Sequence, residues 1–409
     1  MNRFISLNSF ISKQKSGDWG RDSYDEKYNF KVHCIRGADI NAINEGKYDS
    51  LPIRYIESKN KAKLLEEGNI IIEISGGSPS QSTGRVCYVR GVYKNIICSN
   101  FCRAYEIKSD YSAKYFYYLI KNIYNSNVFF NFESKTTGIK NLLIESAFDN
   151  IKVPEFDLPT QQKIAAVLSA LDDKIELNNK INAELEAMAK TLYDYWFVQF
   201  EFPNADGKPY KSSGGKMVYN ETLKREIPEG WEVKRFGDLF EISRGNIITK
   251  ETSTVGEYKV VAAGLNFSYY HNEYNREKFT ITVSGSGANA GFINFWTERI
   301  YASDCTTVRG SNNYKTFIAL QFLRLYQDYI FSLAKGSAQP HVYPSDIEGL
   351  NFICIPDELI NEYGRISSNI YEKIANNQKQ NQELATLRDW LLPMLMNGQV
   401  KVEEGIMYA

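Results

Sequence analysis

The sequence predicts an α+β fold in which two similar β-rich domains are joined by two long antiparallel helices, a coiled-coil spacer in a pseudo-two-fold duplicated chain. Three observations lead to this prediction. Two long amphipathic stretches repeat each other, each follows a block of short β-rich runs, and each block contains an aromatic helix near its end. At 409 residues with 43% hydrophobic content, the chain is long enough for two or three domains.

The first block, residues 1–157, is expected to be the first of the two β-rich domains. Short β-rich runs at 69–77, 85–91 and 95–107 are separated by turns. A helix is expected from Ser112 to Tyr124, followed by a polar loop and a strand that leads into the first long helix. The opening of this block differs from that of the second block, so we expect the first domain to begin its fold differently.

The region 158–200 is expected to form one long helix. Pro159 suits the first turn, because its missing N–H would have no partner there. Apolar residues recur at steps of three, four and seven, as in a coiled-coil seam, and buried asparagines in a seam can fix register. The candidates for pairing with a second helix are Ile175, Asn178, Asn182, Leu185 and Leu192. Leu177, Ile181 and Met188 lie off the main stripe, where they could contact another subunit.

The region 201–356 is expected to hold a linker and the second β-rich domain. Its start, 203–231, is rich in Gly, Pro, Ser and Lys and is typical of a linker or extended arm. A helix is expected at Thr316–Phe331. The stretch SGSGANAG predicts a tight turn between strands, because strand-forming residues follow it.

The last region, 357–409, is expected to hold the second long helix and a tail. It repeats the first helix when Lys174 is aligned with Lys373. Gly364 and Pro393 lie near its ends and predict a shorter or bent helix. The matching candidates for helix pairing or partner docking are Ile374, Asn377, Asn381, Leu384 and Leu391.

Composition and missing motifs argue against several function classes. The formal net charge is −1, so nucleic-acid binding would have to rest on local surfaces. No apolar run approaches the roughly 18 to 20 residues that span a bilayer, and the N-terminal stretch is unlike a signal peptide, so we expect a cytoplasmic protein with no membrane contact. Six scattered cysteines predict reduced core thiols. We find no motif for a catalytic residue, a metal or another cofactor.

Two polar loops occupy equivalent places after the aromatic helices, at 134–142 and 335–346. Each alone could be a solvated turn. Lys and backbone N–H groups can also donate to phosphates, and Asn or Gln can read base edges. The candidates for DNA contact in these loops are Thr136, Thr137, Lys140, Asn141, Ser337, Gln339, His341 and Tyr343. The Gly/Ser turns that precede the aromatic helices add Ser78, Gln81, Ser286 and Asn289.

The passages 158–197 and IPEGWEVKRFGDLFEISRG at 227–245 resemble the specificity subunit of type I restriction-modification systems. The resemblance covers essentially the whole chain. It implies two target recognition domains, each reading one half of a bipartite asymmetric site on double-stranded DNA. It also implies that the two helices set the spacing and dock the modification (methyltransferase) subunits, with two copies expected. A separate motor subunit would carry the nuclease, so this chain is expected not to be an enzyme.

Two other function classes remain open from the sequence. One is an interaction scaffold with the same duplicated design that does not touch DNA. The other is a self-sufficient enzyme, against which the missing motifs argue. A helix of about 38 residues is roughly 57 Å long, enough to hold two reading domains about one duplex turn or more apart.

Overall fold

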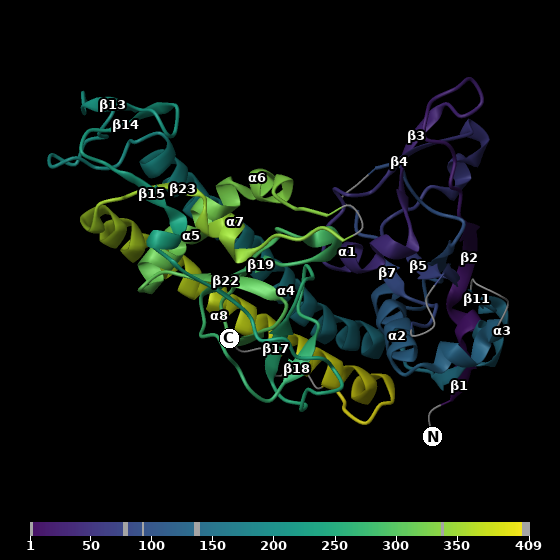
Figure 1. Cartoon of the computed structure of the whole chain (residues 1–409). Helices are drawn as coiled ribbons and strands as arrows, with labels where there is room; N and C mark the ends of the chain where they lie inside the picture. Colours follow the sequence, from purple (N-terminus) through teal and green to yellow (C-terminus); the bar gives the residue numbers. More distant parts are fainter. Residues whose placement is uncertain (1–2, 77–80, 92–93, 135–139, 337–338, 403–409) are drawn as a thin grey trace. The chain divides into compact units, whose positions relative to one another are not determined.

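The computed structural model describes the chain except residues 1–2, 77–80, 92–93, 135–139, 337–338 and 403–409. The chain forms two compact units. The first combines Met1–Leu177 with Gln380–Ala409, and the second is Asn178–Lys379 (Figure 1). Each unit therefore contains one β-rich domain and part of each long helix. The domain boundaries at 157, 200 and 356 stay a prediction.

The first domain is the β-rich part of the first unit. It is built from short elements that precede the first long helix. With 3-10 helices marked η, they are β1 Phe4–Ser6, η1 Leu7–Phe10, β2 Ile11–Ser16, β3 Phe30–Ile35, η2 Gly37–Asp39, α1 Ile40–Asn44, β4 Ile53–Ile56, η3 Ser58–Lys63, β5 Ile70–Glu73, β6 Ser75–Gly76, β7 Val86–Tyr88, β8 Ile96–Cys98, β9 Cys102–Ile107, α2 Ala113–Asn125, η4 Val128–Phe132, β10 Glu133–Ser134, β11 Lys140–Leu142, α3 Ile144–Asn150 and β12 Lys152–Pro154.

The second domain is the corresponding part of the second unit and follows nearly the same order of elements. They are β15 Val233–Arg235, η6 Phe236–Asp238, β16 Glu241–Arg244, β17 Tyr258–Val261, β18 Tyr269–His271, β19 Thr280–Ser284, η7 Gly287–Asn289, β20 Ile293–Trp296, β21 Ile300–Ala302, β22 Cys305–Arg309, α5 Asn313–Leu325, α6 Gln327–Ser332, α7 Pro344–Glu348 and β23 Asn351–Ile353.

The two domains share one sheet topology. Four antiparallel strands lie in the order β2–β9–β5–β7 in the first domain and β16–β22–β19–β20 in the second. A three-stranded sheet follows in each, β4–β3–β8 and β18–β17–β21, with a parallel pair β3–β8 or β17–β21. The fold is therefore duplicated down to its single parallel pairing in each described domain, as the α+β prediction requires.

Both domains also begin their fold in the same way, so the expectation of a different opening is wrong. Strand β1 pairs with the exit strand β12, just as β15 pairs with β23. The following 3-10 helices bury Leu7 and Phe236 completely. The segment from Phe4 to Gly17 is one residue longer than the corresponding segment from Val233 to Gly245. The pairing of β2 with β9 shifts register between Ile11 and Lys13. A β-bulge there absorbs the extra residue, which obscured the match in the sequence.

The long helices are α4 Leu158–Tyr193 and α8 Asp357–Met396, and a π-helix, Asp194–Val198, continues α4. Helix α8 has 40 residues, against 36 in α4 and five more in its π-helical continuation, so α8 is not the markedly shorter helix that was predicted, and the alternative of a bend stays a prediction. Pro393 lies in its last turn, where little helix remains to be disrupted. Gly364 is needed for space, because a Cβ there would overlap the Tyr314 ring.

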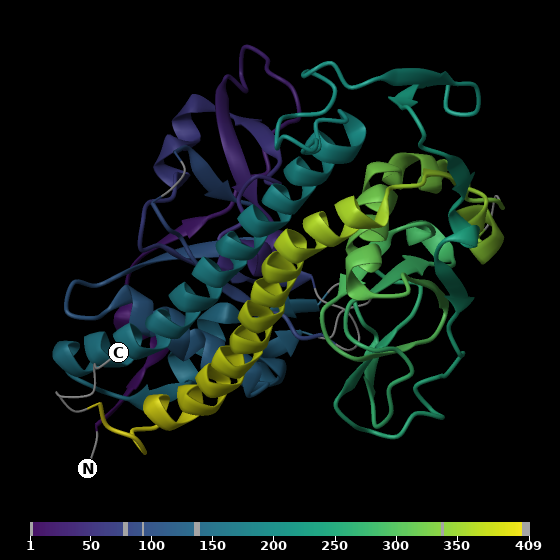
Figure 2. The ribbon, with the colours of Figure 1, turned by 90° about the vertical axis from the view of Figure 1, so that its left-hand side faces the viewer.

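Within the second unit the two helices run antiparallel, as predicted. The amide of Asn377 on α8 donates to Oδ1 of Asn182 on α4, at 2.8 Å, and both side chains are buried. Seven residues further along α4, the carbonyl of Ala189 accepts a hydrogen bond from the Tyr363 hydroxyl of α8, at 3.2 Å. From the first of these contacts to the second, residue numbers increase along α4 and decrease along α8, so the helices run in opposite directions. Figure 2 shows them as the teal and yellow helices. The two seam asparagines therefore pair with each other, which fixes one register.

Two local expectations are corrected. Residues 203–231 are not only a linker, because they contain the hairpin β13 Met217–Asn220 with β14 Arg225–Pro228. Phe202 anchors this arm, since its ring stacks on Tyr210 at 4.6 Å and on Trp231 at 5.1 Å. The helix expected at Thr316–Phe331 is two helices, α5 and α6. In the described part of the chain, no helix is long and apolar enough to cross a membrane.

Candidate nucleic-acid interface

In both domains the structure brings the Gly/Ser turn against the polar loop. In the first domain β6 pairs with β11, so that Ser75 lies opposite Asn141, and the Ser75 hydroxyl donates to Asn141 Oδ1 at 2.7 Å. In the second, Ser286 forms a bridge with His341, and the Gly287 N–H donates to the carbonyl of Pro340 at 3.0 Å. Candidates from separate stretches of sequence therefore form one surface in each domain.

In the first domain, Asn141 is the best-placed candidate. Its side chain is exposed, and its Nδ2 donates to no described residue. Lys140 is a weaker candidate, because its ammonium lies 3.3 Å from the buried carboxylate of Glu133 and donates to the carbonyl of Gln81 at 3.3 Å. Its charge therefore holds the loop in place. Three further candidates, Thr136, Thr137 and Ser78, lie outside the described residues.

In the second domain, the described candidates of the polar loop are Gln339, His341 and Tyr343. Gln339 is exposed, and the His341 ring stacks on Tyr343 with centroids 6.0 Å apart. Asp346 accepts from the Tyr343 N–H at 2.9 Å and pairs with Lys335 at 2.9 Å, which fixes the loop where α7 begins. Asn289 is partly buried in η7, and Ser337 lies outside the described residues.

The turn between β19 and β20 agrees with the sequence prediction. The two strands are antiparallel, with Val283 opposite Ile293, and the Gly-rich stretch between them forms η7. Gly287 and Gly291 have φ of +78° and +91°, which only glycine adopts without strain. This stretch opens no long helix, so it lacks the geometry of a dinucleotide-binding loop.

Sequence reasoning missed a hollow of about 570 Å³ beside the first Gly/Ser turn. Its most exposed aromatic side chain is Phe101, at 52%. The hollow is lined by Trp19, Arg36, Gly37, Ala38, Glu73, Ser75, Gly76, Ser99, Asn100 and Phe101. The turn at Ser99–Phe101 splits the run 95–107 into β8 and β9, and the Ser-Asn pair inside that run was the signal that could have revealed it.

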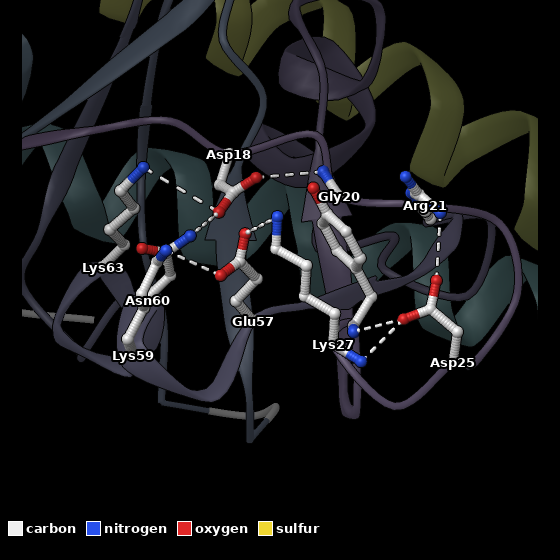
Figure 3. Close-up of polar contacts among 10 residues, drawn as sticks. Asp18, Gly20, Arg21, Asp25, Lys27, Glu57, Lys59, Asn60 and Lys63 are labelled. Carbon is white, nitrogen blue, oxygen red and sulfur yellow. Dashed lines mark hydrogen bonds and ion pairs between the residues drawn. The ribbon is translucent and has the colours of Figure 1, made fainter.

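In a second polar cluster of the first domain, the charged side chains pair with one another (Figure 3). Around η3, Lys59 and Lys27 both pair with Glu57, at 2.7 and 3.4 Å, and the hydrogen bond from Lys59 lowers the pKa of Glu57. Lys63 donates to the carbonyl of Gly17 at 3.1 Å and lies 3.8 Å from Asp18. These lysines hold loops together and are weaker candidates for phosphate contact.

The helix candidates differ in exposure. Asn178, Asn182, Asn377 and Ile374 are buried, whereas Leu177 and Met188 are 50% and 59% exposed. The remaining candidates are partly buried: Ile175, Ile181, Leu185, Leu192, Asn381, Leu384 and Leu391. The exposed pair is therefore the part of this set that is available to a partner.

The cysteines and acidic residues suggest no metal centre. All six cysteines are free, and five are buried. Burial raises the pKa of the Cys34 and Cys98 thiols to about 12, so both stay protonated near neutral pH. Within the described residues, no group of three or more His, Cys, Asp or Glu side chains is arranged to hold a metal ion.

Two diverged copies of one fold, each with a polar loop set against a Gly/Ser turn, define a protein with two duplicated α+β domains. The family model described as the type I restriction modification DNA specificity domain matches residues 11–187 and 228–386. The chain therefore belongs to the family of type I restriction-modification specificity subunits. This membership does not favour the scaffold alternative that binds no DNA.

Relatives match over most of their length. The type I restriction enzyme MjaIX specificity subunit of Methanocaldococcus jannaschii is 30% identical, over 91% of this chain and 90% of its own. The HindI specificity subunit of Haemophilus influenzae is 24% identical, over 83% and 88%. The crystal structure of the type I restriction-modification S subunit from M. genitalium has a TM-score of 0.55 at 18% identity and 96% coverage of both chains, which supports the fold.

Proposed function

We propose that each domain reads one half of a bipartite asymmetric site on double-stranded DNA, and that the length of the helices sets the spacing of the halves. The chain itself would carry no catalytic centre. Two modification subunits would dock on it and carry out methyl transfer, and a motor subunit would cleave DNA through the complex. We place this assembly in the cytoplasm.

One observation carries this proposal: the same juxtaposition of Gly/Ser turn and polar loop recurs in both domains, with different side chains. Asn141 stands beside Ser75 in one, and His341 stands beside Ser286 in the other. A shared backbone arrangement with different hydrogen-bonding groups is what two readers of different sequences need.

Replacing both Gln339 and His341 with alanine is expected to relax recognition of one half-site. Each lost base contact should cost about 1 to 3 kcal/mol of discrimination. Mapping methylated adenines across the host genome by single-molecule sequencing, with the wild-type and the variant gene, measures this. Asn141→Ala is the matched variant and should relax the other half-site instead. Equal loss at both halves in either variant would contradict the assignment.

Leu177→Asp and, separately, Met188→Asp are expected to weaken co-purification of the modification subunits. Each would place a carboxylate in an apolar contact, which costs several kcal/mol when it has no partner. Ala183→Asp adds the same charge at another exposed position of α4 and is the control. Unchanged pull-down yields for both variants would rule out these two residues as docking contacts.

Salt dependence separates DNA recognition from protein-only scaffolding. Phosphate contacts release counterions, so the affinity of the purified complex for duplex DNA should fall steeply as salt rises. Binding to duplex DNA that does not depend on salt, or no binding at all, would favour a scaffold.

A further inference from the structure

An ion pair links β16 to the second Gly/Ser turn. Arg244 Nη2 lies 3.1 Å from Oδ1 of Asp304, and the Ser286 hydroxyl donates to the other carboxylate oxygen at 2.9 Å. Ser286 in turn forms the bridge with His341. Asp304 therefore ties Arg244 to the surface that carries the polar loop of the second domain.

The backbone of Arg244 is held firmly while its guanidinium is open to solvent. The Arg276 guanidinium donates to the Arg244 carbonyl at 3.3 Å and to the Ser243 hydroxyl at 3.0 Å. The next residue, Gly245, donates its N–H to the carbonyl of Cys305 at 2.9 Å. The Arg244 side chain is 56% exposed, and its guanidinium bonds only Asp304 among the described residues. A fixed backbone lowers the entropy that is lost when a solvent-facing side chain binds a ligand, so Arg244 is suited to ligand contact.

At the corresponding position, the described residues of the first domain form no such pair. Gly17 and Gly245 both follow the first strand of the four-stranded sheet, so Ser16 takes the place of Arg244. Ser99 donates its N–H to the carbonyl of Ile35 as Ser303 does to that of Val261, so Asn100 takes the place of Asp304. The pair is thus present at this position in one domain and not in its copy, as expected of a feature that distinguishes two half-sites.

We propose that Arg244 reads a guanine in the half-site bound by the second domain, with Asp304 as its positioning residue. The inference rests on the proposed function. The parallel N–H groups of a guanidinium match O6 and N7 of guanine in the major groove. A phosphate is disfavoured at this position, because the Asp304 carboxylate would repel it. Asp304 itself accepts from both Arg244 and Ser286, so its carboxylate is committed to positioning.

The test maps methylated motifs in host cells that carry variants of the full gene. Arg244→Ala should make one guanine position of one half-site degenerate, with discrimination falling roughly 5- to 150-fold and the other half unchanged. Arg244→Lys should also lose this discrimination, because an ammonium lacks the paired donors. Asp304→Asn keeps an acceptor oxygen and should retain more discrimination than Asp304→Ala.

Arg299→Ala is the matched control. Arg299 is also half-exposed and paired, with Glu277 at 3.0 Å, but it follows the end of β20 remote from the Gly/Ser turn, and its loss should leave the motif unchanged. A uniform fall in methylation with Arg244→Ala, or a wild-type motif retained by Arg244→Lys, would overturn guanine reading. A bipartite wild-type motif without guanine would also overturn it while the proposed function stands. No bipartite motif dependent on the gene would refute the proposed function itself.

Discussion

Replacing Asp172 with alanine is expected to destabilise the first unit by about 3 to 5 kcal/mol. Asp172 on α4 accepts from the Arg388 guanidinium of α8 at 2.6 Å and from the Tyr118 hydroxyl of α2 at 2.7 Å. The side chains of Asp172 and Arg388 are only 16% and 17% exposed. Burial works to lower the pKa of Arg388, but Asp172 and Asp389 together outweigh burial and raise that pKa. Without the carboxylate, a largely buried cation keeps only its neighbour Asp389.

Amide hydrogen exchange of the full chain measures this loss, because it reports opening in α2 and in the first turns of α4 separately from the second unit. Asp172→Asn keeps an acceptor for Tyr118 and should lose less than Asp172→Ala. Lys190→Ala breaks an exposed pair with Asp194 and should cost under about 1 kcal/mol. If Asp172→Ala and Lys190→Ala had equal effects, the buried pair would not stabilise the unit.

The long helices and their seam could be predicted from sequence because the signal is local. Apolar spacing defines a face, and two asparagines interrupt it in each helix, Asn178 and Asn182 in α4 and their repeats Asn377 and Asn381 in α8. The bond in the structure joins Asn182 to Asn377, which is the repeat of Asn178, so the repeat identified the residues but not this pairing. Duplication of the domains was visible for the same reason, since it preserves the order of elements even where side chains differ.

The details of the candidate surfaces could not be predicted, because they depend on side-chain burial and on pairings between strands. Glu133 lies only seven residues before Lys140, but nothing in the sequence shows that its carboxylate is buried and takes up the charge of Lys140. Arg244 and Asp304 lie 60 residues apart and meet only because β16 pairs with β22. The shifted opening of the first domain was hidden by one bulged residue, which changes the register of every later comparison.

Replacing Gly245 with alanine is expected to cost the second domain more than about 3 kcal/mol and to abolish reading of one half-site. A Cβ at this position would overlap the carbonyl oxygen of Ser303 and the backbone of Ala302. Backbone atoms cannot rotate away as a side chain can, so the end of β16 would have to move away from the segment that connects β21 to β22. Arg244 immediately precedes this glycine, and its guanidinium would leave the Gly/Ser turn with the strand.

The chain offers two comparisons for this variant. Gly17→Ala would overlap the carbonyl of Ser99 in the same way and should abolish reading of the opposite half-site. Gly207→Ala meets no neighbour, and its φ of +71° should cost only about 1 kcal/mol without changing the motif. Amide hydrogen exchange in β16 and β22 should become faster in the Gly245→Ala variant. Measured together with the methylation motif, it tests whether movement of the strand accompanies lost recognition. Intact exchange protection with a lost motif would contradict the steric mechanism, because the glycine would then act on DNA directly.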